Sequence, residues 1–214
     1  MTFQALRDRM VDEQLVRRGI ADRLVLDAFR RVPRHEFVPP EAIANAYDDT
    51  PLSIGDGQTI SQPYVVAITV EKLGLQGHER VLEIGAGSGY AAAILGAIVR
   101  EVVTVERIEL LARTAAARLA RLGMTNVDVQ HADGSLGWSA GAPYEAICVA
   151  AGAPKPPPAL LAQLVIGGRL VVPSGPLDHQ NLLRITRRDD LTYDEEDLGA
   201  VRFVPLVGSE GWPG

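Results

Sequence analysis

From Arg80 onward, short β-rich runs alternate with helical stretches, and this rhythm limits the possible folds more than any other feature of the chain. Strand–helix alternation at this spacing indicates a parallel sheet whose strands are joined by helical crossovers. The expected strands are Val81–Ile84, Val102–Val105, Val127–Gln130, Ala146–Ala150 and Arg169–Val172, and the expected helices are Ala91–Ile98, Leu110–Leu122 and Pro158–Leu164. The middle strands are apolar throughout, as expected where helices cover both faces of a sheet.

The segments on either side follow other patterns. From Phe3 to about Ala46, apolar residues recur at helical spacing, with Gly19 between two expected helices and Pro33 at the end of the second. After Pro173, two further strands are expected at Leu182–Arg187 and Val201–Val207, joined through the polar stretch Arg188–Asp197 and including an antiparallel pair. We therefore predict an α/β fold: a doubly wound, mostly parallel seven-stranded Rossmann-like sheet with an added N-terminal helical layer.

The composition is that of an ordinary globular protein, with 47% hydrophobic and 22% charged residues. The formal net charge is −6 and Lys and Arg form no cluster, so nucleic acid is not an expected partner. No apolar stretch fits a signal peptide or a membrane span, so no membrane association is expected. The single cysteine, Cys148, fits a small buried side chain in a reducing compartment. We expect a cytoplasmic protein.

A glycine-rich turn runs from Glu83 to Tyr90, where the first strand of the alternating region ends and a helix begins. Its glycines, Gly85, Gly87 and Gly89, allow positive φ and close approach of a ligand to the backbone. The next strand ends at Glu106, seventeen residues past Gly89, where a carboxylate can accept two hydrogen bonds from a ribose diol. Taken alone, the turn also fits a tight connection without a ligand, and Glu106 fits a solvated charge.

A dinucleotide is the main competing ligand for this turn. Its fingerprint requires a glycine at the sixth position, which here is Tyr90, and a P-loop is excluded because no Gly-Lys-Ser/Thr follows. The spacing instead resembles the nucleoside methyltransferase turn, which holds an amino acid rather than a pyrophosphate. Asp133 and Gly134, just past the third strand, could accept the exocyclic amine of an adenine and let the ring lie close, although Asp-Gly alone is simply a turn.

The stretch Ile54–Pro63 is unusual before a helix. Gly55 and Gly57 indicate a loop, and Pro63 suits the first position of a helix over Tyr64–Lys72. The polar side chains of Gln58, Thr59 and Ser61 then crowd a helix N-terminus, which is a suitable place for an anion. Ordinary capping by Ser61 or Gln62 explains the same residues and is slightly favoured by the local sequence.

Several of these stretches together resemble the protein-L-isoaspartate O-methyltransferase family. The resemblance is carried by Asp56–Tyr64, Val81–Tyr90, Asp133–Trp138 and Gly167–Val171, and it extends to Arg34–Pro39 and Phe203–Leu206, so it spans nearly the whole chain. Its specific part is Thr-Ile-Ser-Gln-Pro, because methyltransferases in general share only the cofactor turn. One departure is Asp56, beside this segment, where the family often carries His.

The resemblance implies methyl transfer from S-adenosyl-L-methionine, giving S-adenosyl-L-homocysteine, to the free α-carboxylate of L-isoaspartyl residues in damaged proteins or peptides. The ester would close to a succinimide and so begin repair. Ser61 would be the catalytic hydroxyl, and Ser61, Val66 and Val207 would contact the substrate. The implied cofactor-binding residues are Gln58, Thr59, Ile60, Glu83, Gly85, Ala86, Gly87, Glu106, Arg107, Asp133 and Gly134.

The implied organisation is one S-adenosylmethionine-dependent methyltransferase domain over residues 1–214. It comprises a helical and active-site segment (1–75), a cofactor-binding core (76–175) and C-terminal strands (176–214), and a monomer is expected. A carboxylate is already ionised at pH 7, so the reaction needs neither a general base nor a metal. The alternatives are a related methyltransferase acting on a normal aspartate of a specific peptide, a nicotinamide-dependent oxidoreductase, and a binding protein that has lost activity.

Overall fold

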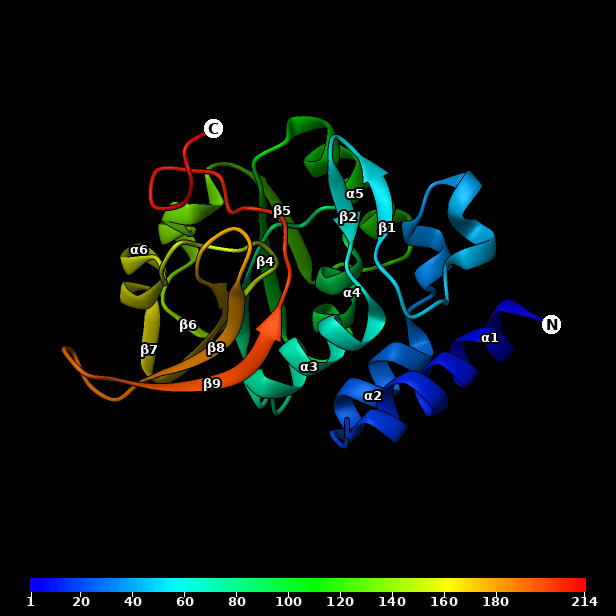
Figure 1. Cartoon of the computed structure of the whole chain (residues 1–214), viewed down its shortest axis with the longest axis horizontal. Helices are drawn as coiled ribbons and strands as arrows, with labels where there is room; N and C mark the ends of the chain where they lie inside the picture. Colours follow the sequence, from blue (N-terminus) through cyan, green and yellow to red (C-terminus); the bar gives the residue numbers. More distant parts are fainter.

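The computed structural model describes residues 1–214 and contains a central seven-stranded sheet in the order β5-β4-β3-β6-β7-β8-β9 (Figure 1). Its strands are β3 Arg80–Ile84, β4 Glu101–Glu106, β5 Val127–His131, β6 Tyr144–Val149, β7 Leu164–Ser174, β8 Gln180–Arg187 and β9 Tyr193–Val201. The strands from β5 to β7 pair in parallel, whereas β7, β8 and β9 pair antiparallel. The expected doubly wound, mostly parallel α/β fold is confirmed.

Helices cover both faces of this sheet. Those that follow or precede its parallel strands are α3 Pro63–Leu73, α4 Tyr90–Gly96, α5 Glu109–Arg121 and α6 Pro158–Ala162. Successive residues of a strand point to opposite faces, so Val81 packs in the core that contains α3 and α4, whereas Leu82 packs in the core beneath α6. Burial on both faces explains why the central strands are apolar along their whole length.

The N-terminal layer packs on the α3 and α4 side. It begins with α1 Phe3–Met10, which continues through a π turn at Val11–Leu15 and a 3-10 turn at Val16–Arg18. Gly19 then ends this first helical stretch in a left-handed conformation (φ 95°), and α2 Arg23–Arg31 starts behind an Asp22 cap. Two short 3-10 turns follow at Arg34–Phe37 and Pro40–Asn45. The added helical layer is therefore present, with Gly19 as its internal boundary.

The expectation for the last strand was wrong. β9 ends at Val201, where the expected strand Val201–Val207 was to begin, and it takes up the second half of the stretch Arg188–Asp197 that we expected to be a connection. The reason is that β9 is an edge strand whose residues are mostly exposed, so its charged side chains are compatible with pairing to β8. The apolar residues after it leave the sheet.

Other boundaries differ less. The helix expected at Pro158–Leu164 ends at Ala162, and β7 begins at Leu164, before the expected start at Arg169. The register between β6 and β7 is irregular between Tyr144 and Ala146, which accommodates the extra residues of β7. None of the helices combines the length and the apolar character that crossing a lipid bilayer requires.

A carboxylate on α3 joins the N-terminal layer to the rest of the molecule. Glu71 Oε1 accepts hydrogen bonds from the backbone N–H groups of Ala21, at 2.7 Å, and Asp22, at 2.8 Å. Both groups lie in the turn that starts α2, and no other acceptor is found for either of them. One oxygen atom thus fixes where the second helix of the layer begins.

Replacing Glu71 with alanine should lower the free energy of unfolding by about 1–2 kcal/mol, because two backbone donors lose a charged acceptor. Urea denaturation at pH 7 measures this change. Glu71→Gln is the matched control, since its amide oxygen can still accept both bonds, and it should lose less than half as much. Equal losses in the two variants would contradict a role for the shared oxygen.

Candidate functional site

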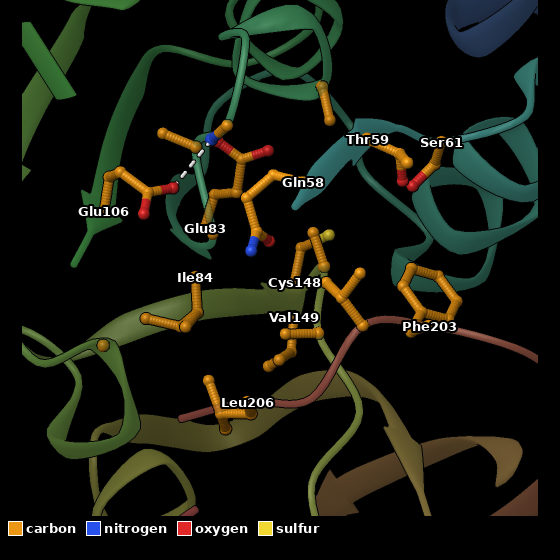
Figure 2. Close-up of a pocket in the computed structure, with 18 of the residues that line it drawn as sticks. Gln58, Thr59, Ser61, Glu83, Ile84, Glu106, Cys148, Val149, Phe203 and Leu206 are labelled. Carbon is orange, nitrogen blue, oxygen red and sulfur yellow. Dashed lines mark hydrogen bonds between the residues drawn. The ribbon is translucent and has the colours of Figure 1, made fainter. Parts of the chain in front are cut away.

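A pocket of about 980 Å³, counted to its open mouth, lies at the carboxyl ends of β3, β4 and β6 (Figure 2). Its walls come from residues 58–61, 83–88, 105–107, 148–151 and 203–207, with further residues from α3 and α4. This is the edge at which open α/β sheets bind ligands. The pocket is therefore the candidate functional site.

The glycine-rich turn forms one wall of the pocket. The Gly85 N–H donates to the Val105 carbonyl at 2.8 Å, which continues the pairing of β3 with β4 beyond the end of the strand. Gly89 caps α4 with φ 88°, and a Cβ there would lie 3.3 Å from Leu119 and 3.4 Å from Ala115. A residue without a side chain is thus needed for α4 to start at this point and pack closely against α5.

Glu106 at the end of β4 is almost completely buried and is held by the backbone. Its Oε2 accepts from the Gly87 N–H and its Oε1 from the Ile108 N–H, both at 2.9 Å; the first of these bonds is drawn in Figure 2. Each carboxylate oxygen can accept one more hydrogen bond. The side chain can therefore accept two hydroxyl groups of a ligand without moving.

Glu83 lies in the same pocket but in a different environment. It is fully buried, its Oε2 accepts from the Thr104 hydroxyl, and its Oε1 has no partner. Burial, opposed in part by the Thr104 hydrogen bond and assisted by the charge of Glu106, raises the pKa of Glu83 to about 8. Without a ligand, Glu83 is therefore mainly the neutral acid at pH 7, and a bound cation would favour its carboxylate.

A β-hairpin forms the opposite wall, where the sequence indicated a loop. Strands β1 Leu52–Gly55 and β2 Gln58–Ile60 pair across a tight turn in which Asp56 and Gly57 have φ of 50° and 69°. Two consecutive positive φ values are typical of the Asp-Gly hairpin turn, so this dipeptide was the signal that could have revealed the hairpin. Asp56 is exposed at its tip and does not line the pocket.

The hairpin leads directly into α3 and brings two hydroxyl groups to the pocket. Figure 2 shows the Thr59 and Ser61 hydroxyls pointing toward each other, at the end of the pocket opposite Glu106. The residue before α3 is Gln62, and no side chain caps this helix. The Gln62 side chain instead donates to the Asp49 carbonyl at 3.1 Å. Ordinary capping therefore does not explain Ser61.

Asp133 and Gly134 have separate roles in the structure. Gly134 lines the pocket, and a Cβ there would lie 2.6 Å from Ile84 Cγ2, so the close approach requires glycine. Asp133 does not line it. Its carboxylate accepts from the Ser135 N–H and hydroxyl, at 2.9 and 2.7 Å, and from the Ser209 N–H at 2.8 Å. Asp133 thus ties this wall to the C-terminal segment.

The remaining wall is Phe203–Val207, which the sequence indicated as a strand. Two bonds of 2.8 Å, from Gly152 N–H to the Val204 carbonyl and from Leu206 N–H to the Gly152 carbonyl, fix it beside β6. Sequence reasoning missed Gln180, whose buried Oε1 accepts from the Phe203 N–H at 2.8 Å. A polar residue at the start of an apolar strand was its only signal.

The structure brings the expected site residues together in this pocket, with Asp133 behind its wall. Those that line it are Gln58, Thr59, Ile60, Ser61, Val66, Glu83, Gly85, Ala86, Gly87, Glu106, Arg107, Gly134 and Val207.

The raised pKa of Glu83 predicts that the stability of the protein without ligand depends on pH. The protonated acid is favoured in the folded state, so this contribution is complete below about pH 4.5 and is lost as the pH rises through about 8. Glu83→Gln cannot ionise and should become more stable than the parent by on the order of 1 kcal/mol or more at pH 8.5. Urea denaturation at pH 5 and 8.5 measures the difference in free energy of unfolding between variant and parent. Glu109→Gln, at an exposed position, is the control. A gap that does not widen with pH would contradict the prediction.

Comparison with known proteins agrees with this geometry. The family model for protein-L-isoaspartate(D-aspartate) O-methyltransferases matches residues 6–211. A protein-L-isoaspartate O-methyltransferase from Rhodopseudomonas palustris strain HaA2 is 58% identical over 212 residues, which span 99% of this chain and 86% of the relative. Another from Syntrophobacter fumaroxidans is 52% identical over 214 residues, the full length of both proteins.

Solved structures agree with the sequence matches. A protein-L-isoaspartate O-methyltransferase superimposes with a TM-score of 0.88 at 32% identity, covering 96% of this chain and 67% of the other. A Plasmodium falciparum protein described with the same activity, in complex with S-adenosyl-L-homocysteine, gives a TM-score of 0.81 at 25% identity, covering 92% and 96% of the two chains. The chain belongs to the protein-L-isoaspartate(D-aspartate) O-methyltransferase family.

Proposed function

We propose that this chain transfers the methyl group of S-adenosyl-L-methionine to the free α-carboxylate of L-isoaspartyl residues in damaged proteins and peptides, and so initiates repair through a succinimide. The observation that carries the proposal is the presence, in one pocket, of a braced strand-end carboxylate at one end and the Thr59 and Ser61 hydroxyls at the other. The family match and the S-adenosyl-L-homocysteine bound to a structural relative support it.

The residues at the glycine-turn end fit the cofactor. Glu106 would accept the ribose hydroxyls, and Gly134 would let an adenine ring lie against the backbone. Glu83 has an unpartnered oxygen in the pocket and would accept from the cofactor's ammonium group, which would return the acid to its carboxylate form. The other proposed contacts come from Gln58, Thr59, Ile60, Gly85, Ala86, Gly87 and Arg107, with Asp133 supporting Gly134.

The opposite end would hold the reacting carboxylate. S-adenosyl-L-methionine supplies an electrophilic methyl group on a sulfonium sulfur. The substrate carboxylate is ionised at pH 7, so the protein has no proton to remove and its task is to orient the nucleophile and exclude water. Orientation of two bound reactants contributes on the order of 7–11 kcal/mol. We assign this to the Ser61 hydroxyl, with Val66 and Val207 as apolar contacts.

We further propose that residues 1–214 act as one domain, because the pocket takes its walls from each of the three parts, 1–75, 76–175 and 176–214. A cytoplasmic location and the absence of nucleic acid partners stay predictions from composition, and a monomeric state stays a prediction as well. Size-exclusion chromatography with light scattering would test the oligomeric state directly.

Removing the Ser61 hydroxyl should slow turnover at least tenfold and leave cofactor affinity within about twofold, because the hydroxyl orients the substrate rather than the cofactor. The assay uses tritiated S-adenosyl-L-methionine and measures the tritiated methanol released from the methylated isoaspartyl peptide. The aspartyl form of the same peptide is the negative control. Ser53→Ala, in the same hairpin but outside the pocket, is the matched control. Parental rates in Ser61→Ala would remove Ser61 from the mechanism.

Replacing Glu106 with alanine should weaken S-adenosyl-L-methionine binding at least tenfold, because two charge-assisted hydrogen bonds to the ribose are lost. Calorimetry measures the affinity, and Glu109→Ala, exposed on the adjacent helix, is the control. A cofactor analogue without the ribose hydroxyls separates ribose contact from bracing of the turn. The parent should bind this analogue more weakly than it binds the natural cofactor. Glu106→Ala should bind the analogue and the natural cofactor with similar affinity. If the variant still discriminates against the analogue, the ribose assignment fails.

A further inference from the structure

A second cavity adjoins the candidate site and takes part of its lining from α3 and β9. These two elements lie side by side in Figure 1. The residues that line both cavities include Thr59 from β2, Ser61 directly after it, and Phe203, Val204 and Pro205 from the C-terminal segment. We call the second cavity the flank groove. Because it meets the pocket at the Ser61 end, a chain whose isoaspartyl residue lies at Ser61 would have its neighbouring residues in this groove.

The flank groove is mainly apolar. Its side chains from α3 and the last two strands include Ile68, Leu182, Leu198 and Val201. Leu177, in the turn between β7 and β8, adds a large apolar side chain that is 53% exposed. Such a surface favours extended chain with apolar side chains, because their burial removes apolar area from water.

The charges of the groove are all of one sign. The chain carries a net charge of −6, yet no Asp or Glu lines the groove, and its two charged residues are Arg18 and Arg202. The Arg18 guanidinium lies 3.4 Å from the centre of the Tyr64 ring and 2.7 Å from an Asp49 carboxylate oxygen. Arg18 is therefore held in place and largely compensated.

Arg202 is different because no carboxylate of the chain lies within 4.0 Å of its guanidinium. It is exposed, it forms no ion pair and no side-chain hydrogen bond, and it directly precedes Phe203. The Phe203 backbone is fixed by Gln180, so the point from which the Arg202 side chain extends is fixed as well. A guanidinium that extends from a fixed backbone position, without a carboxylate of its own, is complementary to an acidic group on a bound chain.

We propose that the flank groove binds the residues adjoining the isoaspartyl residue, and that Arg202 selects substrates carrying an acidic side chain there beside apolar ones. The proposal rests on the proposed function and adds a preference among isoaspartyl substrates. A basic flanking residue is disfavoured, since it meets the uncompensated arginine.

The test compares isoaspartyl peptides of one length that differ at a single flanking residue, which is glutamate, glutamine or lysine, placed in turn at the two positions before and the two after the isoaspartyl residue. Tritiated-methanol release gives kcat/KM for each. For at least one position the parent should favour glutamate over lysine by about five- to twentyfold, in line with one attractive and one repulsive exposed contact. This ratio should fall as salt is raised.

Variants then assign the ratio to one side chain. Arg202→Gln should bring the ratio of kcat/KM for the glutamate peptide to that for the lysine peptide to within about twofold of unity. Arg202→Glu should reverse this preference. Arg113→Gln, an exposed arginine on α5 outside both cavities, is the matched control and should keep the parental ratio. Circular dichroism of each variant checks that it is folded.

The outcomes separate the two proposals. If the glutamine peptides are methylated but the glutamate-to-lysine ratio is near unity at every position, the flank preference is overturned. The proposed function is then unaffected. A preference for lysine overturns it too and indicates a basic partner chain, and a ratio unchanged in Arg202→Gln removes Arg202 from the selection. If no isoaspartyl peptide is methylated, the proposed function fails and the flank preference fails with it.

Discussion

Two backbone N–H groups converge on the carboxylate of Glu106, and the arrangement of the glycine-turn end of the pocket depends on this contact. Glu106 ends β4, Gly87 lies in the turn after the neighbouring β3, and Ile108 directly precedes α5. One side chain therefore sets the spacing of two strand-to-helix turns and still faces the pocket. A parallel sheet makes this possible, because the carboxyl ends of its strands meet at one edge.

The pocket contains a second buried carboxyl group, Glu83, which differs from Glu106 in its hydrogen-bond partners and its protonation. Glu106 is hydrogen-bonded to two backbone N–H groups, whereas Glu83 has one hydroxyl partner and an oxygen without a partner. Protonation of Glu83 therefore removes the free-energy cost of burying a charged carboxylate. The two side chains thus differ in what they can offer a ligand: Glu106 is preorganised for neutral donors, and Glu83 gains most from a cation. An adenosyl amino acid carries hydroxyls and an ammonium group, which matches this pair.

The sequence was informative where burial or local geometry dictates residue type. The apolar central strands and the glycine turn were predictable because two-sided burial and backbone conformation leave few residues possible. The acidic strand β9 was not, since an edge strand places few demands on its side chains. Asp133 was expected to face a ligand, but its oxygens bind Ser135 and Ser209, and no local pattern could reveal a partner 76 residues away.

The two ends of the pocket differ in how far apart their residues lie in the chain. The glycine-turn end is built from two consecutive strand-end turns, whereas the other end joins the hairpin before α3 to a segment near the C-terminus. That segment is held through hydrogen bonds to Gln180 and Gly152. The hydrogen bonds that hold this segment are thus different from the two that hold Glu106. This separation explains why the glycine turn identifies a cofactor but not a reaction, and why specificity among substrates should reside at positions such as Arg202.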